Sequence, residues 1–106
     1  MAQPQPRRET DSVKVDSGHY SVELDNDQVR IVRAKYGPHE KSVMHTHPAS
    51  VAICMRDTRV RMHYSDGRSE DREMRAGQAF FSGPEEHLPE NLTDEPFEVI
   101  LVELKR

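Results

Sequence analysis

Hydrophobic and polar residues alternate with a period of two along most of this chain, in short segments bounded by turn residues. In residues 58–65, Thr58, Val60, Met62 and Tyr64 fall on one face, while two arginines, a histidine and a serine fall on the other. This alternation predicts a half-buried β-strand. No segment repeats apolar residues at the i, i+3, i+4, i+7 spacing of an amphipathic helix over three turns.

The same pattern, interrupted by turn residues, predicts eight or nine short strands. Asp66-Gly67 is typical of a two-residue hairpin, and Gly37-Pro38 ends the strand before it. Residues 50–55 form a short apolar run, which predicts burial on both faces. The expected strands are residues 20–24, 29–36, 42–47, 50–55, 58–65, 70–74, 78–81, 87–92 and 97–104. The predicted class is therefore all-β, either a sandwich or a small barrel.

The 106 residues of the chain are enough for one domain. Residues 1–17 are polar and contain Pro4 and Pro6, so we expect a flexible N-terminal tail there. Residues 18–106 are then the folded β domain.

Composition and charge argue against several classes of function. The formal net charge of -4 disfavours a nucleic-acid surface, which needs a basic stripe. Cys54 is the only cysteine, so no intrachain disulfide can form, which fits a reducing compartment. Residues 1–10 lack the apolar core of a secretory signal, and no apolar run approaches the roughly 18 residues of a membrane span. We therefore expect a soluble, cytoplasmic protein that binds neither nucleic acid nor membrane.

Two of the six histidines form the pattern with the clearest chemical meaning. His45 and His47 are two residues apart in an expected strand, so both imidazoles point to the same face. Two imidazoles on one face, joined by a third donor, are typical of a transition-metal site. The alternatives are a pair of surface histidines or of hydrogen-bonded core histidines. His19, His39 and His63 have no such setting and are expected to be surface or loop residues.

His87 is the candidate for the third donor because of its setting. The segment from Gly77 to Asn91 reads as a strand, a Gly-Pro loop and then a histidine that enters another strand. His87 lies 40 residues after His47, which is enough chain for several strands to bring it back beside the first pair.

The layout of these residues resembles the cupin superfamily over residues 29–104. His45-Thr46-His47 resembles the H-x-H core of the first cupin motif. Gly77 resembles the opening of the second motif, and the segment from His87 to Asn91 resembles its H-x3-N ending. The resemblance implies a single-domain cupin-type β-barrel, or jelly roll, over residues 18–106.

The chain departs from the cupin motifs at several positions. The first motif's glutamate falls at Val51 or Ala52, and neither side chain can bind a metal. Its opening glycine falls at His39, and Gly83-Pro84-Glu85 replaces P-x-G in the second motif, one residue too close to the histidine. The resemblance therefore implies a metal site of three histidines without a glutamate. These implied ligands are His45, His47 and His87.

Three neutral imidazoles would leave the full 2+ charge on one divalent transition metal, with open coordination positions. Iron, zinc, nickel, copper and manganese all suit such ligands. In the superfamily, three-histidine iron sites look like those of thiol and diketone dioxygenases. We expect a mononuclear metalloenzyme, dioxygenase-like or lyase/isomerase-like, that acts on a small organic substrate. The open alternatives are a non-catalytic module that binds a small ligand or metal, and a barrel without metal.

Further expectations follow for the surroundings of the site. Glu85 and Glu86 are candidate catalytic or ligand-orienting groups, with plain loop solvation as the alternative. Cys54 is expected to be a buried small residue. The resemblance also implies a homodimer. Since a metal binds only neutral imidazoles, metal occupancy is expected to fall below a pH of roughly 6.

Overall fold

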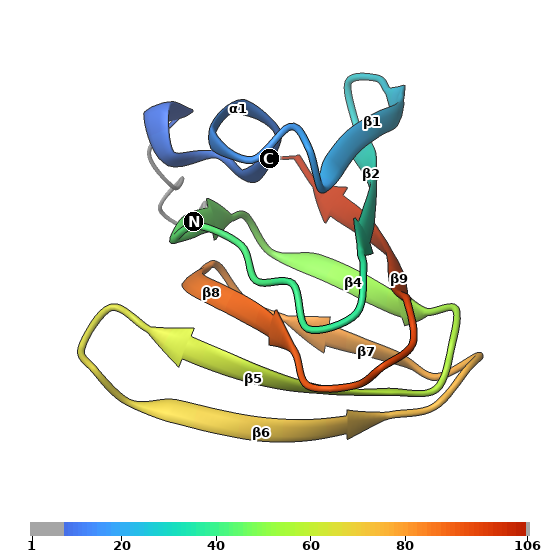
Figure 1. The fold of residues 1–106 in the computed structure, drawn as a ribbon. Helices are drawn as coiled ribbons and strands as arrows, with labels where there is room; N and C mark the ends of the chain where they lie inside the picture. Colours follow the sequence, from blue (N-terminus) through green and yellow to red (C-terminus); the bar gives the residue numbers. More distant parts are fainter. Residues whose placement is uncertain (1–7, 106) are drawn as a thin grey trace.

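Two antiparallel β-sheets face each other in the structure, a computed structural model that describes residues 8–105 (Figure 1). The five-stranded sheet has the order β1-β2-β9-β4-β7, and the four-stranded sheet has the order β3-β8-β5-β6. The strands are β1 (Tyr20–Asp25), β2 (Val29–Tyr36), β3 (His45–His47), β4 (Ser50–Cys54), β5 (Thr58–Tyr64), β6 (Ser69–Met74), β7 (Ala79–Ser82), β8 (Glu85–Asn91) and β9 (Phe97–Leu104). The predicted all-β class is confirmed, and each expected strand has a counterpart.

The period-two pattern determines which side chains enter the space between the sheets. In β5, Val60 and Met62 are buried while Arg59 is exposed, as the alternation predicts. In β2, Val32 and Ala34 are buried on the same inner side. Removing such apolar surface from water is the main favourable contribution to folding, at about 25 cal/mol per Å².

Both sheets carry cross-strand ion pairs on their outer faces, such as Arg61–Asp71 on the four-stranded sheet and Arg33–Glu23 on the five-stranded sheet. On the five-stranded sheet, Val51 and Ile53 point away from the other sheet and are only partly buried. The expected burial of residues 50–55 on both faces is therefore wrong for the single chain.

The polar residues that precede the barrel pack against it. They form two short helical turns, η1 (Arg8–Thr10) and α1 (Ser12–Val15), and α1 contacts β1 and β3. Ser12 is fully buried. Residues 8–17 therefore differ from the expected flexible tail, because polar contacts hold them and a hydrophobic pattern does not report such contacts. Residues 1–7, the rest of that expected tail, lie outside the described residues. No helix in the described part of the chain is long and apolar enough to cross a membrane.

Candidate metal centre

Three imidazoles meet on the inner surface of the four-stranded sheet. β3 places His45 and His47 on this surface, and the antiparallel register of β8 sets His87 directly opposite His45. Ring nitrogens of the three side chains all lie within 4.8 Å of one another, and the ring centroids are 4.6 to 5.0 Å apart. The structure thus brings together the three histidines singled out in the sequence.

Carboxylates hold Nδ1 of two of these histidines. Glu103 Oε2 lies 3.4 Å from Nδ1 of His47, and Glu85 Oε1 lies 2.6 Å from Nδ1 of His87. A carboxylate oxygen accepts, so each Nδ1 carries the hydrogen and donates it. Nε2 therefore keeps its lone pair, which is the state in which an imidazole binds a metal. Carboxylates in this position orient the ligand and raise its basicity.

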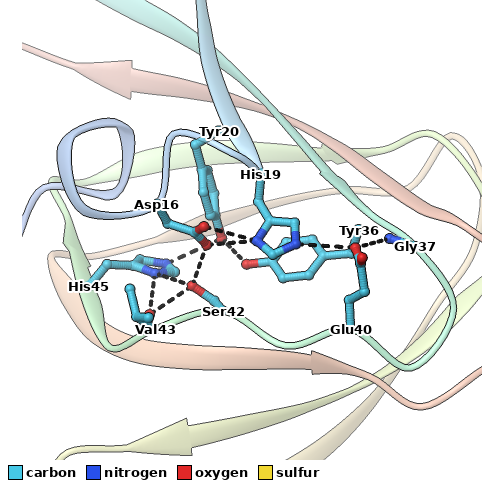
Figure 2. Close-up of polar contacts among 9 residues, drawn as sticks. All are labelled: Asp16, His19, Tyr20, Tyr36, Gly37, Glu40, Ser42, Val43 and His45. Atoms are coloured by element: carbon cyan, nitrogen blue, oxygen red, sulfur yellow. Dashed lines mark hydrogen bonds and ion pairs between the residues drawn. The ribbon is translucent and has the colours of Figure 1, made fainter.

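Neutral oxygens surround the third histidine. Nδ1 of His45 lies 2.9 Å from the Val43 carbonyl oxygen and 2.8 Å from Ser42 Oγ. On the opposite side of the ring, the Tyr20 hydroxyl lies 3.2 Å from Nε2 of His45 and 2.7 Å from the Tyr36 hydroxyl (Figure 2). With the hydrogen on Nδ1, Tyr20 donates to the bare Nε2. A metal would compete with the Tyr20 hydroxyl for that lone pair.

Glu103 is a buried charged residue, with a relative exposure of 1%. Arg30 Nε lies 2.7 Å from Glu103 Oε1, and Arg30 Nη2 lies 2.6 Å from Asp11 Oδ1. Burial by itself would raise the pKa of Glu103, but hydrogen bonds from His47 and Arg30 outweigh burial and lower it. Glu103 is therefore ionised at neutral pH and available to accept from His47.

Burial favours the neutral form of His45 and His87, because it lowers the pKa of each. Burial, together with the neighbouring His47 and His87, lowers the pKa of His45 to about 2. Burial also lowers the pKa of His87, although the hydrogen bond to Glu85 acts in the opposite direction. The hydrogen bond from His87 lowers the pKa of Glu85, so an ionised carboxylate stands behind a neutral imidazole. These directions move the onset of proton competition at His45 and His87 below the pH of roughly 6 expected for free histidines.

The donor set fits a divalent transition metal. Imidazole nitrogens suit iron, zinc, nickel and copper, and metal–nitrogen bonds of about 2.0–2.1 Å would draw the three nitrogens closer together. Within residues 8–105, the group of possible metal ligands consists of the three histidines and contains no carboxylate. Of the two positions at which the cupin glutamate was expected, Ala52 lines the cavity beside the histidines and Val51 points outward.

A cavity of about 60 Å³ adjoins His47 and His87 between the sheets. Its wall is mostly apolar, and Arg72 of β6 contributes a cation. Arg72 Nη2 donates to the Tyr64 hydroxyl at 2.8 Å. Glu85 also lines the cavity. The volume is small beside the roughly 300–1,000 Å³ of pockets for drug-sized ligands.

The other residues considered from the sequence lie in different places. Glu86 pairs with Thr46 across the strands and is exposed, on the side of β8 away from the imidazoles. Cys54 is buried in the core, as expected, and its thiol donates to the Arg56 carbonyl oxygen. His39 is exposed and pairs with an aspartate in a loop.

Tyr20 and Glu103, which contact His45 and His47, are among the residues of the centre that the sequence did not predict. The sequence did contain a signal for Glu103, because it is a charged residue in a mostly apolar strand, and a buried charge needs partners. Nothing in the pattern marks Tyr20, since its contact with His45 depends on how the sheet that contains β1 faces the sheet that contains β3.

The fold of this chain is similar to that of several solved structures. No family model and no curated protein matches the chain. Among solved structures, a cupin domain from Bordetella pertussis Tohama I has a TM-score of 0.77 at 21% identity, covering 82% of this chain and 92% of that chain. A conserved protein with a double-stranded β-helix domain from Klebsiella pneumoniae has a TM-score of 0.65 at 21% identity, covering 84% and 79%. A predicted oxalate decarboxylase from Thermotoga maritima has a TM-score of 0.56 at 19% identity, covering 80% and 78%. These likenesses show that the chain has the cupin fold, which is the fold that the motif resemblance implied.

Proposed function

We propose that this chain is a small cupin-fold metalloprotein that binds one divalent transition metal through His45, His47 and His87 and acts on a small organic substrate. The observation that carries the proposal is the hydrogen bonding behind the imidazoles. Each Nδ1 has an oxygen acceptor, so each Nε2 is left with its lone pair, and one ring nitrogen of each histidine lies within 4.8 Å of the other two. Such outer partners accompany metal-binding histidines in general.

A bound divalent metal would supply Lewis-acid chemistry at open positions, since three neutral ligands do not compensate its charge. The chain itself supplies orientation and exclusion of water. Glu85 and Glu103 hold two of the rings, and the apolar cavity wall limits access of solvent. The Tyr20 hydroxyl is a donor beside the Nε2 of His45.

The substrate is proposed to be small and to carry an anionic group such as a carboxylate. The cavity volume favours a molecule of few atoms, and Arg72 offers the cation in the wall. Guanidinium binds carboxylates through strong, directional hydrogen bonds. The structural neighbour named a predicted oxalate decarboxylase agrees with this class of substrate, at the level of fold alone.

Titration of the metal-free, untagged protein with cobalt(II) and zinc tests the metal site. One equivalent should bind, and His45→Gln or His87→Gln should abolish tight binding. His63→Gln is the control, because His63 pairs with Glu90 on the outer face of the four-stranded sheet. Failure to bind either metal, or equal losses in the control, would contradict the proposal.

Activity is tested on the iron(II)-loaded protein with oxygen uptake over thiols, diketones and small carboxylates. If Arg72 binds the anionic group, Arg72→Met should lower kcat/KM for carboxylates by roughly 10–100-fold, the value of a hydrogen bond to a charged group. An unchanged kcat/KM would exclude Arg72 from substrate binding.

A non-catalytic module that binds a small ligand or metal is the second candidate function. It is favoured by the position of the acidic candidates, since Glu85 is engaged with His87 and Glu86 is exposed on the opposite side. Saturable metal binding without turnover of any substrate in the panel would favour this candidate.

The proposal includes a homodimer formed by the outer face of the five-stranded sheet. Strand register aligns one apolar residue from each of its strands into a row. The row is Leu24, Ile31, Val102, Val51 and Phe81. Its ends are 44% and 62% exposed, and the ion pairs of Arg33 with Glu23 and Glu98 lie beside the row on the same face. A second copy suits this row, because two sheets of equal twist pack face to face and a two-fold interface joins identical patches.

Light scattering after size exclusion tests the homodimer. Val102→Lys places a charge at the centre of the row and should give a folded monomer. Leu88→Lys makes the same change on the outer face of the four-stranded sheet and should remain a dimer. A monomeric parent protein at micromolar concentration would refute this part of the proposal.

A further inference from the structure

The residues that precede the barrel hold the strand that carries two of the histidines. Residues 10–19 are named the N-terminal clasp here. The backbone of Asp11 forms a bridge to Thr46 of β3, and the Thr10 hydroxyl lies 3.1 Å from the Thr46 hydroxyl. Because Thr46 stands between His45 and His47, the clasp touches β3 directly behind its two imidazoles.

Asp16 of the clasp reaches His45 through one serine (Figure 2). Ser42 Oγ lies 2.7 Å from Asp16 Oδ2 and 2.8 Å from Nδ1 of His45. The Val43 carbonyl oxygen is also 2.7 Å from this hydroxyl, but a carboxylate is the stronger acceptor. Ser42 therefore donates to Asp16, and its oxygen accepts the Nδ1 hydrogen of His45.

His19 fixes Asp16 from the other side. Nδ1 of His19 lies 3.0 and 2.9 Å from the two oxygens of Asp16, and its Nε2 lies 3.2 Å from Glu40 Oε1. The His19 ring stacks on Tyr36 with the centroids 4.3 Å apart (Figure 2). His19 was expected to be a surface residue, but its side chain is only 19% exposed. These contacts restrain the Asp16 carboxylate on the side away from Ser42.

Asp11 reaches the other histidine of β3 by a longer route. Asp11 binds Arg30, Arg30 binds one oxygen of Glu103, and the second oxygen of Glu103 lies 3.4 Å from Nδ1 of His47. The last contact is long, and Glu103 keeps Arg30 as a partner if Asp11 is removed. The stronger influence of the clasp is therefore the one that Asp16 exerts on His45.

We infer that Asp16 is a positioning residue of the metal centre, acting on His45 through Ser42, and that the N-terminal clasp is a part of this centre. The inference rests on the proposed function, since the side chain that is positioned is a proposed metal ligand. The Val43 carbonyl oxygen already accepts from Nδ1 of His45, so Ser42, held by Asp16, is a second acceptor that fixes the orientation of the ring. Removing outer partners of metal ligands typically weakens metal binding by about 10–100-fold.

Three variants test this inference: Asp16→Asn, Ser42→Ala and the double variant. The zinc dissociation constant is measured by competition with a chromophoric chelator, and the visible spectrum of bound cobalt(II) reports ligand geometry. Each single variant should weaken zinc binding by about tenfold or more and alter the cobalt spectrum. The double variant should bind no more weakly than Ser42→Ala, because Asp16 acts through Ser42. Glu23→Gln, a change in an exposed carboxylate paired with Arg33, should alter neither quantity.

Zinc affinity and a cobalt spectrum unchanged in Asp16→Asn would overturn the inference, and so would losses that multiply in the double variant. Nitrogen-15 NMR of the metal-free proteins gives a second readout, the chemical shift of the His45 Nδ1 hydrogen, which reports its hydrogen bond to Ser42. The hydrogen should stay on Nδ1 in both proteins, because the Val43 carbonyl oxygen accepts it, but its chemical shift should move in Asp16→Asn; an unchanged chemical shift would also overturn the inference. A parent protein that binds no metal would refute the proposed function, whereas this chemical shift would still decide whether Asp16 positions His45.

Discussion

Acid should destabilise the metal-free protein through His45. Burial lowers the pKa of His45 to about 2 in the folded chain, whereas an unfolded histidine has a pKa of about 6.5. Between these values the unfolded state binds more protons, so the free energy of unfolding falls as the pH falls. This contribution to stability is fully present above the unfolded pKa and is lost progressively as the pH falls toward the folded pKa.

The expected size of the effect follows from the difference in bound protons. One proton bound only by the unfolded state costs about 1.4 kcal/mol per pH unit. Lowering the pH from 7 to 5 should therefore cost about 2 kcal/mol through His45, since the unfolded histidine is mostly protonated only below its own pKa. His87 adds to the loss in the same direction, because burial lowers its pKa too. Domains have total stabilities of about 5–15 kcal/mol, so the loss is measurable.

Urea unfolding of the metal-free protein at pH 7, 6 and 5, followed by far-ultraviolet circular dichroism, measures this loss. His45→Gln should show a weaker dependence on pH than the parent, by about 2 kcal/mol between pH 7 and 5. Val60→Ala, which removes buried methyl groups, should be less stable at every pH but keep the parent's dependence. Equal pH dependence in His45→Gln and the parent would refute the reasoning, as would NMR showing that His45 of the folded parent titrates near pH 6.

Three other predictions concern substitutions of single residues. Tyr20→Phe removes the hydroxyl that competes for Nε2 of His45, so zinc should bind roughly 2–10-fold more tightly, the value of one ordinary hydrogen bond; weaker binding would contradict the competition. Glu85→Gln should weaken zinc binding by about 10–100-fold, while Glu86→Gln should not, as competition titrations would reveal. Gly67 has φ of 92°, so Gly67→Ala should lower the free energy of unfolding by about 1 kcal/mol or more. Gly83→Ala is the control, because φ of Gly83 is not positive and the space around it is open. Equal urea midpoints for Gly67→Ala and Gly83→Ala would contradict the role of the turn.

The sequence was sufficient to predict the strands and the histidine pair, because both depend on the local period of two. β2 and β9 have the predicted bounds, and the polar turn at Asp66-Gly67 joins β5 to β6. That His87 stands directly opposite His45 could not be derived, because the register between β3 and β8 is a long-range pairing. Motif resemblance, not periodicity, carried that part of the prediction.

The hydrogen-bonding partners of the imidazoles were the least predictable part of the centre. Asp16 lies far from His45 in sequence, and Glu103 lies in the other sheet from His47. Ser42 is only three residues before His45, but no spacing rule marks a serine there as a partner of the ring. The polar segment before the barrel lacks apolar periodicity, and its composition therefore predicts a tail. It is held instead by hydrogen bonds and ion pairs, such as the one between Asp11 and Arg30, which composition does not reveal.

The central claim is that His45, His47 and His87 bind a transition metal, and the most direct test is the metal content of the protein itself. Untagged protein is purified without added metal and measured by mass spectrometry of the elements, beside His45→Ala. We predict one transition-metal ion per chain in the parent and almost none in the variant. A parent protein that is metal-free as purified, and stays so after incubation with iron(II), zinc, nickel, copper or manganese, would contradict the claim.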